Sequence, residues 1–228
     1  MKLPDNLDPD LATFTRMATI AMTSLRQSNI ELGDYVLVSG LGLVGNFAAQ
    51  LAQLQGAKVI AADIDESRLE IAKNCGIKKV VNASAKDYEK QIINMTKGKK
   101  VSTYIDATGL SNVISDNLSL VADNGEAILG GSPRAEYQTN VTDVFNHEHL
   151  RGVKLKGALE WLYPTQPSGF VKHSQARNTE IVMELISEGE LQVKPMYTHK
   201  MKPEDASKAY NGLKNKPEDY LGVVFNWK

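Results

Sequence analysis

A glycine-rich turn between a predicted strand and a predicted helix is the strongest chemical signal in this chain. The strand ends at Ser39, and Gly40, Gly42 and Gly45 follow with the spacing Gly-x-Gly-x-x-Gly. In such a turn the first glycine allows a tight bend, the second lets the backbone approach a pyrophosphate, and the third lets helix and strand pack closely. The helix that follows directs unpaired N–H groups and its positive end at the phosphates. The spacing therefore predicts a dinucleotide-binding site.

An acidic residue stands at the distance that such a site requires. Asp63 closes the next predicted strand and follows Gly45 by 18 residues, close to the roughly 20 residues of a dinucleotide-binding unit. A carboxylate at this position accepts hydrogen bonds from both ribose hydroxyls and repels a 2′-phosphate. Asp63 therefore favours NAD over NADP.

Two other interpretations of the glycine turn stay open. Glycine-rich turns are common in loops, so an ordinary strand–turn–helix unit without a ligand is one of them. The other is an S-adenosylmethionine-dependent methyltransferase, which also combines a glycine-rich first turn with an acid after the second strand. That family usually carries an acid just before its glycines, whereas Val38 and Ser39 precede Gly40 here. The apolar strand and the distal acid together favour the dinucleotide.

The composition is that of an ordinary globular protein. The chain has 228 residues, of which 42% are hydrophobic and 23% charged, and its formal net charge is −1. This balance gives no electrostatic case for nucleic acid or an anionic membrane as a partner. No apolar run approaches the ~18 residues of a transmembrane helix, and the N-terminus lacks the apolar core of a signal peptide. Cys75 is the single cysteine, which excludes an intramolecular disulfide. Because these features include no mark of secretion or membrane insertion, the expected location is the cytoplasm.

Strands and helices alternate around the glycine turn. Apolar residues recur at helical spacing over residues 8–28, where Asp8 or Asp10 can cap a helix. Because strands that alternate with single helices give a parallel sheet with right-handed crossovers, we expect such a sheet here. The predicted strands lie near 34–39, 58–63, 78–82, 101–106 and 125–131, and the predicted helices near 43–55, 66–75, 85–96 and 111–122.

The pattern changes after Gly131. Residues 132–150 are polar and irregular, and a sixth strand is expected over 150–159. A helix near 173–188, a helix near 203–214 and a strand near 220–226 complete the chain. The predicted fold class is α/β: a doubly wound, six-stranded parallel sheet of the Rossmann type, order 3-2-1-4-5-6, with a short C-terminal α/β tail. The expected domains are an initial helix at 1–30, a nucleotide-binding domain at 31–160 and a C-terminal segment at 161–228.

Six segments in a fixed order carry a resemblance to a known family. They are Leu32-Gly33-Asp34, residues 59–69, Asp106-Ala-Thr-Gly109, residues 125–131, residues 203–210 and Tyr220-Leu-Gly-Val-Val224. Together with the glycine turn, they resemble the medium-chain dehydrogenase/reductase family, and its zinc-containing alcohol, sorbitol and threonine dehydrogenases in particular. The resemblance implies hydride transfer between a nicotinamide cofactor and a small alcohol or carbonyl substrate.

The resemblance also points to a missing part. A complete family member has a substrate-binding domain, rich in β structure, before the helix where this chain begins. The chain therefore resembles the truncated nucleotide-binding core of a longer oxidoreductase, and the isolated chain is expected to be inactive. A non-catalytic nucleotide-binding or interaction module is the alternative function, and the catalytic residues remain unassigned.

The family's cofactor site can be carried over residue by residue. Val44 corresponds to the residue that packs against the nicotinamide, Asp63 to the ribose-binding acid, and Arg68 to a basic residue over the adenosine ribose. The alternatives for Arg68 and Thr19 are an exposed arginine at a helix start and a threonine on a helix face. The full set of expected cofactor-binding residues is Thr19, Gly40, Leu41, Gly42, Leu43, Val44, Gly45, Asp63, Arg68, Thr108, Gly109, Gly130 and Gly131.

No zinc is predicted in this chain. Catalytic zinc in the family polarises the substrate oxygen, and two of its ligands come from the preceding domain. Thr15, a poor zinc ligand, occupies the position of the third, and Cys75 lies on the wrong helix. His147 and His149 are only two residues apart and are expected in a solvated loop.

The predicted sixth strand implies a homodimer. In the resembling family this strand pairs with its copy in a second subunit. The strand near 150–159 is therefore expected to form the dimer contact, with apolar side chains from Val153, Leu155, Ala158 and Leu159.

Overall fold

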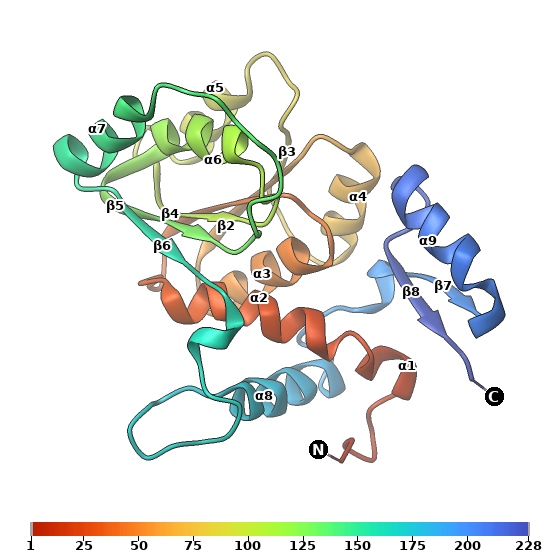
Figure 1. Cartoon of the computed structure of the whole chain (residues 1–228). Helices are drawn as coiled ribbons and strands as arrows, with labels where there is room; N and C mark the ends of the chain where they lie inside the picture. The colour runs from red at the N-terminus through yellow and green to blue at the C-terminus, as the bar shows by residue number, and fades with distance from the viewer. Residues whose placement is uncertain (1, 228) are drawn as a thin grey trace.

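A six-stranded parallel sheet forms the centre of the computed structural model, which describes residues 2–227 (Figure 1). Every neighbouring pair of strands is parallel. The order is β3-β2-β1-β4-β5-β6, which confirms the predicted doubly wound sheet and its reversal between β1 and β4. The strands are β1 (Tyr35–Ser39), β2 (Lys58–Asp63), β3 (Val80–Asn82), β4 (Val101–Asp106), β5 (Val121–Leu129) and β6 (Lys154–Gly157).

Helices cover both faces of the sheet (Figure 1). The first face carries α2 (Thr15–Gln27), α3 (Leu43–Leu54) and α4 (Glu66–Asn74), and the second carries α5 (Tyr88–Met95), α6 (Ser111–Asn117) and α7 (Val141–Arg151). Alternate residues of β1 enter two separate cores. Val36 and Val38 pack in the core under α2 and α3, whereas Leu37 packs with Tyr104 in the second core. Because the strand is buried on both faces, it is a nearly continuous apolar run.

The helix predicted over residues 8–28 is interrupted. It consists of α1 (Pro9–Ala12), capped by the Asp8 side chain through a 2.9 Å bond from the Asp10 N–H, and α2. At the end of α1 the Thr13 hydroxyl donates to the Asp10 carbonyl at 2.7 Å. This side-chain bond occupies a carbonyl that would otherwise serve a continuing helix, which is typical of a helix end.

The segment predicted to be irregular contains a helix. Asn140 caps α7 by accepting a hydrogen bond of 3.2 Å from the Thr142 N–H, and Gly152 ends the helix in the left-handed conformation. None of the residues of α7 is fully buried. The apolar periodicity that would have predicted this helix is therefore weak. The sixth strand, β6, occupies four residues of the predicted 150–159.

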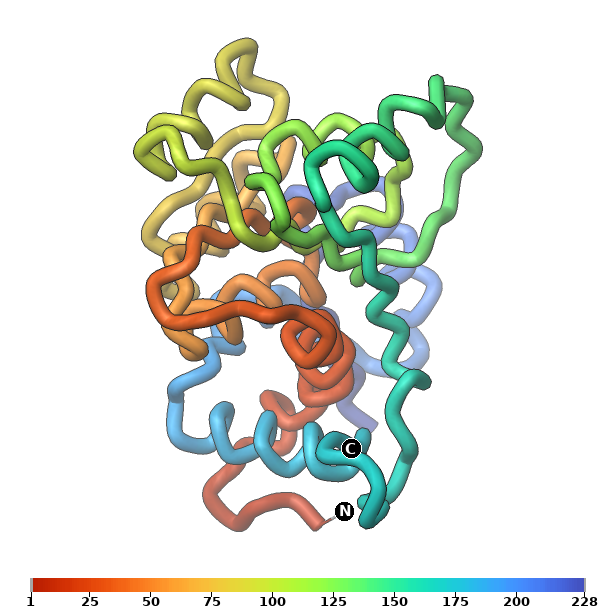
Figure 2. Tube along the Cα trace, turned by 90° about the vertical axis from the view of Figure 1, so that its left-hand side faces the viewer, coloured from red at the N-terminus to blue at the C-terminus, as the bar shows by residue number. Residues whose placement is uncertain are grey.

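A second, small sheet lies beside α4 (Figure 1). Its two parallel strands are β7 (Tyr197–Met201) and β8 (Gly222–Phe225), joined through α9 (Ala206–Asn215). We call β7, α9 and β8 the C-terminal lobe. The strand β7 was not predicted. The helix α8 (Gln175–Ser187) packs against α2 on the side away from the main sheet (Figure 2). Short 3₁₀ turns are η1 (Leu118–Leu120), η2 (Glu160–Leu162), η3 (Lys194–Met196) and η4 (Pro203–Asp205).

Across residues 2–227, no helix has the length and apolar character needed to cross a bilayer.

Candidate cofactor-binding site

The glycine turn joins β1 to α3 at the point where the strand order reverses. Gly40 has φ +86°, in the left-handed region that favours glycine. A Cβ atom on Gly45 would lie 1.7 Å from the Gly40 carbonyl oxygen, so only glycine fits there. Gly42 caps α3, and a Cβ atom on it would meet nothing within 4 Å. The backbone is therefore packed where the turn meets the helix and open where the helix N–H groups face outward. An anionic group can approach this helix start closely.

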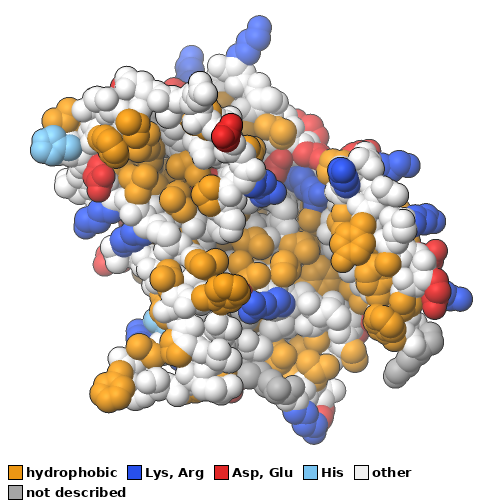
Figure 3. Space-filling model, viewed as in Figure 1, with side chains coloured by type: hydrophobic (Ala, Val, Ile, Leu, Met, Phe, Trp, Pro, Cys, Tyr) orange, Lys and Arg blue, Asp and Glu red, His pale blue; other side chains and the backbone are white. Residues whose placement is uncertain are grey.

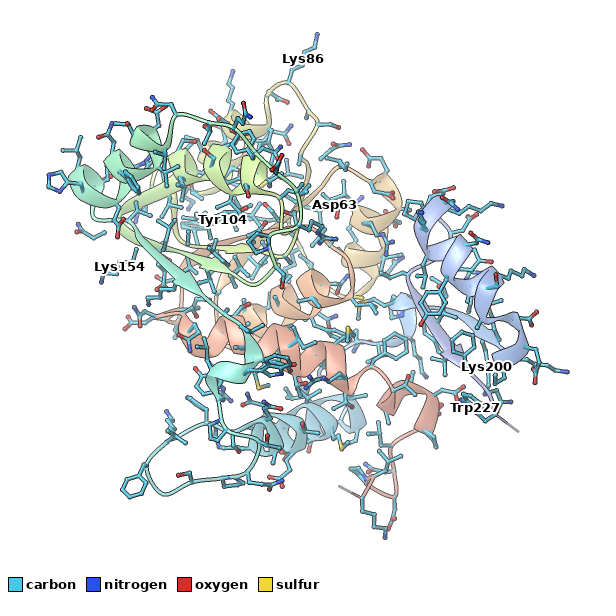
Figure 4. The ribbon with its side chains drawn as sticks, in the orientation of Figure 1. Asp63, Lys86, Tyr104, Lys154, Lys200 and Trp227 are labelled. Atoms are coloured by element: carbon cyan, nitrogen blue, oxygen red, sulfur yellow. The ribbon has the colours of Figure 1, made fainter. Side chains whose placement is uncertain are left out.

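Asp63 lies at the end of β2 and faces this turn (Figure 4). Its Oδ2 accepts a hydrogen bond of 2.6 Å from the Leu41 N–H, and its Oδ1 accepts one of 3.0 Å from the Asp65 N–H. The side chain is half-buried. Each carboxylate oxygen has two lone pairs, so both retain capacity for ligand hydroxyls. The acid that the spacing singles out is thus held against the turn by backbone donors.

Arg68, on α4, connects this region to the C-terminal lobe. Its Nη2 donates to the Tyr220 carbonyl at 3.0 Å, whereas its Nη1 is buried without a hydrogen-bond partner. Burial lowers the pKa of the guanidinium, and the nearby charges of Asp65 and Asp63 oppose that shift. The side chain is half-buried rather than an exposed arginine at a helix start. A buried N–H group without a partner is costly, which makes Nη1 a candidate donor to an acceptor atom of a ligand.

Asp106 organises the ends of β4 and β5, although the sequence did not single it out as a site residue. The fully buried carboxylate accepts hydrogen bonds from the Thr108 hydroxyl at 2.6 Å and from the Gly109 N–H at 2.9 Å. Its backbone carbonyl accepts from the N–H groups of Gly130 and Gly131 at 2.9 and 2.8 Å. All four predicted residues at these strand ends are therefore arranged around one aspartate.

The glycines at these ends are also sterically required. A Cβ atom on Gly130 would lie 2.6 Å from the Ser24 hydroxyl, and one on Gly131 would lie 2.4 Å from the Gly109 nitrogen. A side chain at Gly131 would displace the backbone, and one at Gly130 would displace the buried Ser24 side chain.

An open cleft of about 440 Å³ lies beside these residues. It brings Val44 together with Gly130 and Gly131. Arg134, which the sequence did not single out, also lines it and donates from Nη2 to the Thr108 carbonyl. Thr19 is absent from the cleft wall: its hydroxyl donates to the Arg16 carbonyl at 2.8 Å, and its neighbour Ile20 lines the cleft instead. The lining residues are Ile20, Val44, Ala107, Gly130, Gly131, Ser132, Pro133 and Arg134.

A second, mainly apolar cavity of about 330 Å³ separates the start of α3 from the C-terminal lobe. Hydrophobic side chains are exposed in the hollow that Figure 3 shows between the sheet and this lobe. The cavity is next to the glycine turn because Leu43 belongs to both. Its lining residues are Thr13, Phe14, Met17, Leu43, Val223, Val224, Phe225 and Trp227.

The described residues do not by themselves supply a complete set of zinc ligands. Within residues 2–227, no group of three or more His, Cys, Asp or Glu side chains is placed to hold a metal. Thr15 is buried, and its hydroxyl has no hydrogen-bond partner. Burial raises the pKa of the Cys75 thiol to about 12, so this side chain is a neutral thiol, whereas zinc binds thiolate.

His147 and His149 lie on α7 and not in the predicted loop. The Nδ1 of His147 lies 2.9 Å from Nη1 of Arg151.

Comparison with known proteins relates the chain to dehydrogenases. An uncharacterized zinc-type alcohol dehydrogenase-like protein of Haemophilus influenzae is 33% identical over 135 residues, which are 59% of this chain and 40% of that protein. L-Threonine 3-dehydrogenase of Escherichia fergusonii is 26% identical over 99% of this chain and 61% of its own length. The chain therefore spans between 40% and 61% of these relatives.

A solved structure shares the fold. A short chain alcohol dehydrogenase of Escherichia coli CFT073, complexed with NADH, superposes with a TM-score of 0.83 at 20% identity, over 100% of this chain and 62% of that protein. Residues 44–161 match the family model described as zinc-binding dehydrogenase, which covers more than half of the chain. The chain is thus a member of the zinc-binding dehydrogenase family.

Proposed function

We propose that this chain binds NAD(H) at the glycine turn and forms the nucleotide-binding part of an oxidoreductase. When completed by a substrate-binding domain, it would transfer hydride between the nicotinamide and an alcohol or carbonyl substrate. The observation that carries the proposal is the contrast between Gly42 and Gly45. The backbone is open at Gly42, where a pyrophosphate would approach, and packed at Gly45, where helix and strand must touch.

The other residues have matching roles in this proposal. The α3 N-terminus faces the pyrophosphate, and the Asp63 carboxylate accepts from the adenosine ribose. The unpartnered Nη1 of Arg68 supplies a donor beside that ribose. Val44, Gly130 and Gly131 border the cleft that would receive the nicotinamide ring. The cofactor supplies the hydride chemistry when bound, and the chain supplies position and electrostatics.

NAD is proposed over NADP because Asp63 brings a negative charge to the ribose. Calorimetric titration of the purified chain with NADH and, separately, with NADPH tests both parts of the proposal. If NADH binds more tightly than NADPH, both the nucleotide site and the NAD preference are supported. Tighter NADPH binding would overturn the preference but retain the site, and the absence of binding to either would contradict a working site in this chain.

We further propose that the isolated chain turns over little substrate. Its relatives extend well beyond the matched region, and the apolar cavity lined by Leu43 and Phe225 offers a surface for such additional structure. A steady-state assay with simple alcohols and NAD should give rates far below the ~1–1,000 s⁻¹ typical of enzymes. Rates in that range would contradict this proposal.

The alternative function is a non-catalytic nucleotide-binding or interaction module. The buried hydroxyl of Thr15 at the expected ligand position favours that alternative, since a hydroxyl is a poor zinc ligand.

We propose that this chain holds no zinc by itself. After the purified chain has been dialysed against zinc and then against zinc-free buffer, elemental analysis should find much less than one zinc ion per chain. One bound zinc ion per chain would contradict the proposal.

We also propose a homodimer through β6, which lies at an edge of the main sheet. The apolar contacts differ from those predicted, because Val153 and Ala158 are buried within the chain. Leu155 is partly buried, and Leu159 is 56% exposed. An open edge with an apolar flank favours pairing with a second copy.

Light scattering at micromolar concentration should give twice the 25.0 kDa chain mass. Leu159→Asp should shift the mass toward a monomer. Leu213→Asp, on α9, is the matched control for a half-exposed leucine elsewhere and should not. A monomeric unmodified chain would contradict the dimer.

A further inference from the structure

Positive charge is concentrated in one segment of a chain whose net charge is −1. Residues 73–100 contain eight lysines and only two acidic residues, Asp87 and Glu89. Among residues 2–227, Lys73 is the only one of these lysines that forms an ion pair, with Glu70 at 3.1 Å. The other seven form no ion pair within the described residues, so the flank of the molecule that this segment forms has a local excess of positive charge, which attracts anions.

Three lysines meet at one cavity on this flank. Lys58 is the first residue of β2, whereas Lys78 and Lys79 lead into β3. Because β2 and β3 are parallel neighbours, their amino ends lie side by side. The cavity has a volume of about 300 Å³, and no acidic residue lines it; the lining residues are Gln53, Ala57, Lys58, Val59, Lys78 and Lys79.

Two of the ammonium groups lie close to one tyrosine ring. The Nζ atoms of Lys58 and Lys79 lie 5.3 and 5.5 Å from the centre of the Tyr35 ring. Each contact is a favourable cation–π interaction, and both lysines line the same cavity. An anion in that cavity would offset the repulsion between their like charges.

The lysines keep donors for such an anion. Lys79 uses one N–H group on the Met95 carbonyl, at 3.1 Å, which leaves two. Neither Lys58 nor Lys78 has a side-chain hydrogen bond or ion pair within the described part of the chain, and both are exposed. Up to eight N–H donors are therefore free at one cavity wall.

We infer that this cavity is an anion-binding site whose ligand is a small molecule that carries a phosphate group. Ammonium groups bind phosphate oxygens through charge-assisted hydrogen bonds, which are among the stronger ones in proteins. The methyl groups of Ala57 and Val59 provide an apolar wall for the rest of such a molecule. The volume lies at the lower end of the range for small-molecule sites.

The site is separate from the proposed cofactor site. Tyr35 begins β1 beside the cavity, and Gly40 follows the other end of β1. Five strand residues span about 17 Å, so the two sites lie at opposite ends of the parallel strands, this one at their amino ends and the cofactor site at their carboxyl ends. Occupation of one does not block the other, and the inference holds whether or not the chain binds NAD(H).

Nuclear magnetic resonance titration with inorganic phosphate tests this inference, because backbone amide shifts locate the ion. Potassium chloride at matched ionic strength is the control for general screening. Phosphate, but not chloride, should cause saturable shifts at Lys58, Val59, Lys78 and Lys79. Shifts at residues 40–45 would report phosphate at the glycine turn and so are read separately.

Paired variants distinguish a built site from diffuse charge. K58Q/K78Q removes two cavity lysines and should weaken phosphate binding by about tenfold or more. K86Q/K90Q removes the same charge from exposed positions outside the cavity (Lys86 is labelled in Figure 4), and should change the affinity by less than about twofold. If K58Q/K78Q loses its folded spectrum, the single K78Q replaces it, because Lys78 is exposed.

Two results would overturn the inference. One is the absence of saturable shifts at residues 58, 78 and 79. The other is an equal loss of affinity in both double variants, which would show that phosphate responds to overall charge and not to this cavity.

Discussion

The Leu41 N–H donates a 2.6 Å hydrogen bond to Oδ2 of Asp63, across 22 residues of sequence. This bond joins the turn after β1 to the end of β2, the two segments on which the proposed cofactor site depends. A carboxylate at Asp63 thus has a structural role as well as the proposed role in ribose binding, and the two can be separated by substitution.

Asp63→Asn should weaken NADH binding by about tenfold and narrow the preference over NADPH. The amide keeps one oxygen for the Leu41 N–H, but its NH2 group cannot accept from the Asp65 N–H or from a ribose hydroxyl. The negative charge that would repel a 2′-phosphate is also lost. Calorimetry with each nucleotide measures both effects. Asp116→Asn, at an exposed aspartate on α6, is the charge-matched control and should leave both affinities unchanged. Unaltered NADH affinity in Asp63→Asn would remove Asp63 from the site.

Gly42→Ala and Gly45→Ala should separate binding from stability. A methyl group at Gly42 meets nothing within 4 Å, so the melting temperature should stay close to that of the unmodified chain while NADH affinity falls. At Gly45 the same methyl group would lie 1.7 Å from the Gly40 carbonyl oxygen. The backbone must then move, at a cost of about 1–3 kcal/mol in unfolding free energy. Thermal melts and calorimetry on both variants test the contrast, and equal effects of the two would contradict the proposed roles.

Glu126 should be important for stability. This buried carboxylate accepts from the Asn29 N–H at 2.6 Å, the Thr103 hydroxyl at 3.1 Å and the Lys156 ammonium at 2.6 Å. Glu126→Ala leaves these donors without their acceptor and should lower the unfolding free energy by about 2–4 kcal/mol. Urea denaturation measures this loss of unfolding free energy. Glu148→Ala, at an exposed glutamate on α7, is the control and should change the unfolding free energy by less than about 0.5 kcal/mol.

Stability should fall in alkaline solution, in part through Tyr88. Burial raises the pKa of its hydroxyl from 10.0 to about 12. Below pH 10 neither the folded nor the unfolded form loses this proton, so the contribution is complete there. Between pH 10 and about 12 only the unfolded form ionises, and the unfolding free energy therefore decreases as pH rises.

Tyr88→Phe should flatten this decrease. The variant also loses the 3.0 Å hydrogen bond to Asn117 and will be less stable at neutral pH. The informative quantity is therefore the slope of unfolding free energy against pH, from urea titrations across this range. Tyr210→Phe, at an exposed tyrosine on α9, is the control for general effects of alkali. An unchanged slope in Tyr88→Phe would show that another group governs the alkaline loss.

Local patterns were sufficient for the elements that are buried on both faces or carry strong turn residues. The apolar runs of β1, β2 and β4 and the glycines after β1 predicted the sheet, its order and the turn. The same patterns failed where burial is shallow. The helix α7 has no fully buried residue, and the residues of β7 are at most half-buried, so neither shows a clear apolar period.

The sequence alone determined the α/β class, the parallel sheet and the position of Asp63 relative to the glycine turn, because these depend on short-range spacing. Only the tertiary structure revealed that Asp106 organises four of the predicted site residues and that Lys58 and Lys79 both contact the Tyr35 ring. Parallel neighbours bring strand ends together from distant parts of the chain, and the pairing register then decides which side chains meet. Periodicity reports which face of an element is buried, but it carries no information on such long-range partners.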